Sequence, residues 1–229
     1  MKDISFNAYL PLCEQYNNVA QSFYQQHLDA KQQLTQFEES VDLLDNFNRA
    51  IAKAELEMGV LQTAICAVVF EAFAIEAYVN FFGAYTLGDS TYYSIYESGE
   101  QGKRYSTIEK IKSLCKEQFA SPYPTDGEHF RRLKGLFEKR GRLAHNKPKR
   151  HEISTKNGEN FGDYYDAMNE ISFVYDNLEK EMDLYNEVRM NLTAASKQPE
   201  PIDAYIESAA TVTAKSFIQM ITRDKPPEE

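Results

Sequence analysis

The feature that most restricts the fold is a long apolar stretch over residues 60–82. Glu71, Glu76 and Asn80 interrupt this stretch, so no run of 18 apolar residues remains and a membrane span is not expected. Because the stretch is apolar nearly all round, rather than on one face, it predicts the central helix of a bundle that other helices cover.

Helical periodicity recurs along the rest of the chain, with apolar residues at steps of three and four. Only 10 Gly and 8 Pro occur in 229 residues, which disfavours a turn-rich all-β fold. The pattern therefore predicts an all-α helical bundle of about five to six helices. The expected helices cover residues 10–40, 45–85, 106–118, 128–146, 164–192 and 202–221.

Glycines and a capping pattern mark the expected helix ends. Gly83 and Gly88 are expected to end the apolar helix, because glycine commonly terminates helices. Residues 86–105 are polar and contain glycine, so they predict a loop. Ser106 is followed three positions later by Glu109, and this spacing predicts a capping box at the start of a short helix.

The segment 164–192 predicts one long helix with an apolar seam suited to packing against another helix. The seam consists of Tyr164, Met168, Ile171, Tyr175, Leu178, Met182 and Tyr185. Residues 1–195 are expected to form a single helical domain, on which the N-terminal helix 10–40 packs. Residues 196–229 are expected to hold a linker, a last helix and an acidic tail.

Cysteine and histidine positions argue against a disulfide scaffold and against a metal centre. Cys13, Cys66 and Cys115 are far apart and odd in number, which fits a reducing cytoplasm. The N-terminus lacks the basic-then-apolar pattern of a signal peptide. His129 and His151 have no Cys or carboxylate at ligand spacing, so neither a metal nor a cofactor is expected.

Charge is distributed unevenly along the chain. The formal net charge is −10, yet residues 131–150 hold nine basic groups against one acidic group, Glu138, which gives this block +8. Such a block can hold phosphates by counterion release and attract an anionic ligand. The alternative is a solvated helix face whose cations pair with acidic helices beside it.

Arg140 and His145 form an R-x4-H pair inside the basic block, where the helix of residues 128–146 is about to end. As a bare pattern the pair is unspecific, since roughly half a match is expected by chance in a chain of this size. Its position in the basic block adds weight, and so does the segment IEAYVN at residues 75–80 of the apolar helix.

The order of these pieces resembles the HEPN superfamily of small helical domains. In that family an early helix carries an EA-aromatic-aliphatic-N stretch, a short helix and a Pro-rich break follow, and a late helix ends in R-x4-6-H. The matching segments here are EAYVN (76–80), STIEK (106–110) and RGRLAH (140–145), and LAHN (143–146) is similar to the family's hydrophobic-small-His ending. The resemblance covers about residues 50–185.

The resemblance implies a metal-independent endoribonuclease that acts as a toxin or an antiviral defence effector, with an antitoxin or another defence protein as partner. In such a reaction the RNA 2′-hydroxyl attacks the adjacent phosphodiester and leaves a 2′,3′-cyclic phosphate and a 5′-hydroxyl. His145 is the residue type that can move the protons, and Arg140 is the type that can hold the phosphate.

Other residues receive supporting roles. Glu76 and Asn80 are neighbours one helical turn apart, and Arg140 is the expected partner of the Glu76 carboxylate. His27 falls on the apolar stripe of the first helix and is expected to be a packed core residue. The expected RNA-binding cations are Arg142, Lys147, Lys149 and Arg150.

Geometry and one departure from the family pattern leave two functions open. Five helical steps place Arg140 and His145 about 140° apart, so either the helix loosens at Gly141 or a second copy completes the site, as in a homodimer. The family usually has a polar residue, often Asn, where this chain has Gly141. The alternative to a nuclease is therefore a non-catalytic HEPN-like module for RNA binding or protein–protein assembly.

Overall fold

The fold is all-α, as the periodicity predicts. A computed structural model describes residues 6–40, 46–96, 105–145 and 170–197, and these ranges contain helices and turns but no strand. The expected helix 202–221 lies outside the described residues, as do Lys147, Lys149 and Arg150. The described residues fall into two compact units, one within residues 6–80 and 124–188, the other within residues 81–123 and 189–197.

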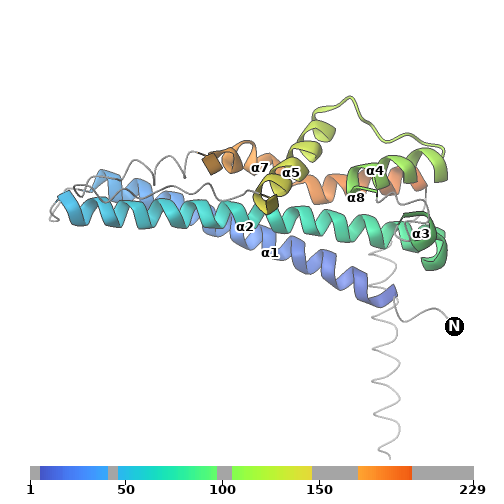
Figure 1. Cartoon of the computed structure of the whole chain (residues 1–229), viewed down its shortest axis with the longest axis horizontal. Coiled ribbons are helices and arrows are strands. Elements are labelled where there is room, and N and C mark those ends of the chain that lie inside the picture. The colour runs from blue at the N-terminus through green and yellow to red at the C-terminus, as the bar shows by residue number, and fades with distance from the viewer. Residues whose placement is uncertain (1–5, 41–45, 97–104, 146–169, 198–229) are drawn as a thin grey trace, which may run out of the picture. The chain divides into compact units, whose positions relative to one another are not determined.

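The first unit is built on an antiparallel pair of long helices, α1 (Phe6–Glu39) and α2 (Asn46–Leu87), which Figure 1 shows in blue and cyan. Ring contacts join Tyr16 to Phe73 and Phe23 to Phe70, and an ion pair of 2.7 Å joins Glu38 to Lys53. Both helices predicted for this part of the chain, 10–40 and 45–85, are confirmed. His27 is buried between them, as expected, and its Nδ1 donates to the Val60 carbonyl at 3.0 Å.

The apolar helix α2 is long and apolar enough to cross a membrane, judged by length and composition alone. Its middle section instead contacts protein. About half of this apolar section is buried inside the protein, and Glu71 within it is 0% exposed and hydrogen-bonded to another helix. A protein-covered core helix explains both features, because a buried carboxyl needs a polar partner.

The second unit contains a helix that the sequence pattern missed. Residues 86–105 were expected to be a loop, but α3 (Asp89–Tyr96) lies within them and buries Tyr92 and Tyr96. Burial of the two rings explains the error. Tyr96 packs at a tilt against Tyr92, one turn away, and its hydroxyl forms a hydrogen bond of 2.9 Å with Ser113 of the following helix. A polar composition does not reveal such long-range contacts.

Two glycines near the end of α2 have different roles. Gly88 ends the helix with a φ of 82°, a left-handed conformation that glycine adopts readily. Gly83 does not end it, contrary to expectation, because α2 continues to Leu87. A Cβ at Gly83 would collide with the ring of Tyr92, so this glycine allows α3 to pack against α2.

The capping box is confirmed at the start of α4 (Thr107–Ser113). The Ser106 side chain accepts from the Glu109 N–H, and the Glu109 carboxylate accepts from the Ser106 N–H at 2.8 Å. The helix continues as a π-helical turn, Leu114–Gln118, so the expected range of 106–118 also holds.

The prediction of one long helix over residues 164–192 is wrong over its described part. The segment consists of a 3-10 turn (Ser172–Tyr175), the short helix α7 (Leu178–Glu181) and α8 (Leu184–Ser196). The first break lies at Asp176 and Asn177. Asp176 is extended, and Asn177 has a φ of 58° in the left-handed region that Asn tolerates. The seam is correspondingly split, with Tyr185 fully buried but Tyr175 37% exposed.

Replacing Gly83 by Ala is expected to destabilise the fold by about 1–3 kcal/mol, because the new methyl group overlaps the Tyr92 ring. Gly59→Ala is the matched control in the same helix. Its Cβ meets nothing within 4 Å, so stability should rise by about 0.5–1 kcal/mol. Urea unfolding of the two variants measures both changes, and equal stabilities would contradict the proposed contact.

Candidate functional site

The R-x4-H pair lies on α5 (Glu128–His145), the confirmed helix predicted for residues 128–146. Arg140 contacts α2, as expected because the Glu76 carboxylate on that helix needs a partner. Its Nη2 is 3.7 Å from Glu76 Oε2, and its guanidinium carbon is 5.4 Å from the centre of the Phe73 ring. Two segments far apart in the sequence, EAYVN and RGRLAH, therefore meet in space through Glu76 and Arg140.

His145 is the last residue of α5, and it is exposed. The helix does not loosen at Gly141, where an added Cβ would meet open space. On this unbroken helix, Arg140 and His145 point about 140° apart, and Arg140 is already directed toward α2. One protomer therefore does not place both side chains on one face of α5.

Two further predicted residues are described. Asn80 is half-buried on α2, one turn after Glu76. Arg142 is exposed, and its guanidinium carbon lies 3.5 Å from the centre of the Phe173 ring. Arg142 thus packs against the 3-10 turn that precedes α7, a partner that sequence spacing did not suggest.

The basic block is partly neutralised by carboxylates from other helices. Of its six described cations, three form ion pairs: Arg132 with Glu187, Lys139 with Glu181, and Arg140 with Glu76. The alternative of a cationic face that pairs with acidic helices is therefore correct for these three. The exposed cations of the described block are Arg131, Lys134 and Arg142.

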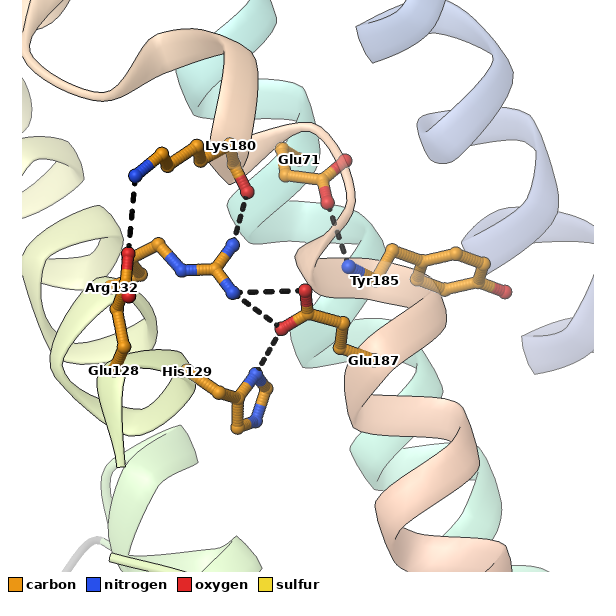
Figure 2. A network of polar contacts seen from close by, with 7 residues as sticks. All are labelled: Glu71, Glu128, His129, Arg132, Lys180, Tyr185 and Glu187. Carbon is orange, nitrogen blue, oxygen red and sulfur yellow. Dashed lines mark hydrogen bonds and ion pairs between the residues drawn. The ribbon is translucent and has the colours of Figure 1, made fainter. Parts of the chain in front are cut away.

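A polar network at the start of α5, shown in Figure 2, was not predicted. Glu187 on α8 accepts from His129 Nδ1 at 2.5 Å and from Arg132 Nη2 at 2.9 and 3.0 Å. Arg132 also donates to the Lys180 carbonyl at 2.5 Å, and Lys180 pairs with Glu128 at 3.2 Å. These contacts fix the rotation of α5 against the segment that carries α7 and α8.

A second buried pair fixes the same helices further along. Lys139 on α5 donates to Glu181 Oε2 at 2.8 Å and to the Asp176 carbonyl, which belongs to the first break in the 170–197 segment. Burial raises the pKa of Glu181, and the hydrogen bond and charge of Lys139 oppose that shift. The Lys139 side chain of α5 therefore stabilises the non-helical backbone at Asp176.

Glu71 is a buried carboxyl group for which the sequence pattern predicted no role, beyond marking it as an interruption of the apolar stretch 60–82. Its Oε1 accepts the backbone N–H of Tyr185, in the first turn of α8, at 2.8 Å (Figure 2). Its Oε2 is buried and has no hydrogen-bond partner among the described residues. Glu71 thus supplies, from α2, the capping acceptor that the start of α8 needs.

The pKa of Glu71 is raised to about 8, chiefly because the carboxyl is buried. The hydrogen bond from the Tyr185 N–H opposes this shift, and the nearby carboxylates of Asp183 and Glu181 add to it. The carboxyl is therefore largely protonated at neutral pH, which avoids an isolated buried charge. The signal in the sequence was a carboxylate, one of two with Glu76, inside a stretch that is apolar nearly all round. This signal does not indicate that the partner of Glu71 is the backbone N–H of Tyr185.

No disulfide joins Cys13, Cys66 and Cys115, and burial raises the pKa of the Cys115 thiol to about 12. In the described part of the chain, no three His, Cys, Asp or Glu side chains gather closely enough to hold a metal ion. Comparison with protein-family models, curated proteins and solved structures finds no match to this chain. The resemblance to the HEPN superfamily therefore rests on the motifs alone.

The Glu71 carboxyl predicts that stability falls as the pH rises. Its pKa is raised from 4.5 to about 8 in the folded chain, so its contribution is complete below pH 4.5 and is lost as the pH rises through 8. Glu71→Gln keeps an oxygen acceptor for Tyr185 but cannot ionise. At pH 9 this variant should be more stable than wild type, by up to several kcal/mol at about 1.4 kcal/mol per pKa unit.

Urea unfolding at pH 5, 7 and 9 tests this expectation. Glu55→Gln, at an exposed position of the same helix, is the control and should keep the wild-type pH profile. If the wild-type and Glu71→Gln profiles run parallel, then the Glu71 carboxyl is ionised throughout and the assigned protonation is wrong.

Proposed function

We propose that this chain is a HEPN-like, metal-independent endoribonuclease whose active site is completed by a second copy of the chain. The observation that carries the proposal is the contact between the two motif segments, with Glu76 of EAYVN 3.7 Å from Arg140 of RGRLAH. Motif pieces that resemble one family and also meet in space support a shared site more strongly than either pattern alone.

The proposed reaction needs no side-chain nucleophile. The 2′-hydroxyl of RNA attacks the adjacent phosphorus, the bond to the 5′-oxygen breaks, and a cyclic phosphate and a 5′-hydroxyl result. His145, exposed at the end of α5, transfers the protons. Arg140 binds the phosphate and stabilises the charge that builds up on it, with Glu76 and Phe73 setting the direction of its guanidinium.

A second protomer is part of the proposal because of the helix geometry. Arg140 and His145 point about 140° apart on an unbroken α5, so they do not converge on one phosphate within one chain. In a two-fold dimer, Arg140 of one copy can face His145 of the other. The proposed partners are RNA, a second copy, and an antitoxin or defence protein, and the proposed location is the cytoplasm.

The alternative is a non-catalytic HEPN-like module that binds RNA or assembles with another protein. One observation favours it. The guanidinium of Arg140 is already paired with Glu76, and the neighbouring position, where the family often has Asn, is Gly141. A nuclease assay separates the two functions directly.

His145→Ala is expected to lower RNA cleavage at least about 100-fold, because it removes the general acid–base group. Purified wild-type and variant proteins are compared on a labelled RNA, with product ends analysed for the cyclic phosphate. Cleavage by wild type should persist in EDTA and fall steeply with salt. Arg131→Ala, an exposed position three turns before Arg142 on the same helix, is the control and should stay active.

Equal cleavage by wild type and His145→Ala would exclude the proposed chemistry and leave the non-catalytic module. Activity that EDTA abolishes would show that a different reaction takes place. Expression toxicity in bacteria that disappears in His145→Ala is a simpler parallel readout.

Mixing two inactive variants tests the shared site. If Arg140 and His145 act across the dimer, a heterodimer of Arg140→Ala and His145→Ala contains one intact pair, and activity should return to about a quarter of wild type in a statistical mixture. Sedimentation of each sample confirms the dimer. No recovery in co-refolded or co-expressed dimers would place the functional pair within one chain.

A further inference from the structure

The contact between Arg142 and Phe173 has a geometry that the proposed reaction does not use. The guanidinium carbon lies 3.5 Å from the ring centre, which is close to the contact distance of two carbon atoms. At this distance the guanidinium lies roughly flat on the ring, because an upright orientation would push its nitrogens into the ring carbons. One face of the guanidinium is thus covered by Phe173.

The other face of Arg142 is on the exposed side of α5. Arg142 is exposed, and within the described ranges its guanidinium makes no hydrogen bond or ion pair. It differs in this respect from Arg132, Lys139 and Arg140, whose charges are paired with carboxylates. Among the described residues, Arg142 is therefore not paired with a carboxylate and presents an exposed planar surface.

Arg142 also shares its side of the helix with His145. Three helical steps place these two side chains about 60° apart, whereas Arg140 points about 160° from Arg142. The residue that lies beside His145 in one protomer is thus Arg142, and a ligand that reaches His145 passes next to the Arg142 plane.

From this geometry we infer that Arg142, backed by Phe173, is a stacking platform for an unpaired nucleobase next to His145. The inference rests on the proposed function and adds to it a subsite for one unpaired base. Arginine planes and aromatic rings stack on splayed-out bases, while bases in a duplex are already stacked on one another. Phe173 prevents the guanidinium from turning edge-on, so the platform is formed before RNA binds.

The test measures binding of the full chain by fluorescence anisotropy, with a 2′-O-methyl oligoribonucleotide that resists cleavage. The second ligand is the same oligonucleotide with abasic residues, and the third is its duplex. Wild type should bind the intact single strand at least about fivefold tighter than the abasic one. The duplex should also bind more weakly than the intact strand.

Arg142→Lys keeps the charge but loses the plane, so it should bind the intact and abasic strands within about twofold of each other. Phe173→Leu should act in the same way, because the guanidinium loses the ring that orients it. Arg131→Lys is the matched control on the same helix and should keep the wild-type ratio. Circular dichroism verifies that each variant is folded.

Three results would overturn the inference. Wild type could bind the intact and abasic strands equally, Arg142→Lys could keep the wild-type ratio of the two affinities, or wild type could bind neither strand. Cleavage of unmodified RNA is scored separately. Base-dependent binding without cleavage would retain the platform and reject the nuclease. Cleavage that His145 requires, together with base-independent binding, would retain the nuclease and reject the platform.

Discussion

The hydrogen bond from the Tyr185 N–H to the buried Glu71 carboxyl determines where the last described helix begins. Without an acceptor at this point, the first turn of α8 would bury an unsatisfied N–H group. Glu71 supplies that acceptor from the middle of α2, and Tyr185 packs its ring on Tyr78 of the same helix while its hydroxyl donates to Glu14 on α1. Three helices are thereby aligned around one carboxyl.

The basic helix α5 is attached to this arrangement by charge. Glu187, Glu181 and Glu76 each accept one of its cations, two of them from the segment that Glu71 positions and one from α2 itself. The Lys139 pair is the most buried of these, so removing one partner would leave an uncompensated charge in the interior. Three carboxylates from other parts of the chain thus complement the charge of one basic helix.

The sequence predicted what depends on local pattern and missed what depends on distant contacts. Helical periodicity located α1, α2 and α5, and the Ser106–Glu109 spacing located the capping box. The pairing of Glu76 with Arg140 was also predicted, because a carboxylate on an apolar helix needs a polar or charged partner. The helix α3, the break at Asn177 and the role of Glu71 were not foreseen, since each is set by side chains from other elements.

The contrast between Arg140 and Arg142 shows why a count of charges in the sequence cannot assign their roles. Two helical steps separate the two arginines, so they project to nearly opposite sides of α5, and Gly141 between them adds no side chain. Arg140 faces the Glu76 carboxylate, which partly cancels the positive field that an RNA phosphate near Arg140 would experience. Arg142 faces an aromatic ring, which holds the guanidinium without neutralising it. An anion that approaches the end of α5 is therefore attracted more strongly by Arg142 than by Arg140 of the same chain, and an Arg140 contact with phosphate requires the Glu76 pair to be shared or opened.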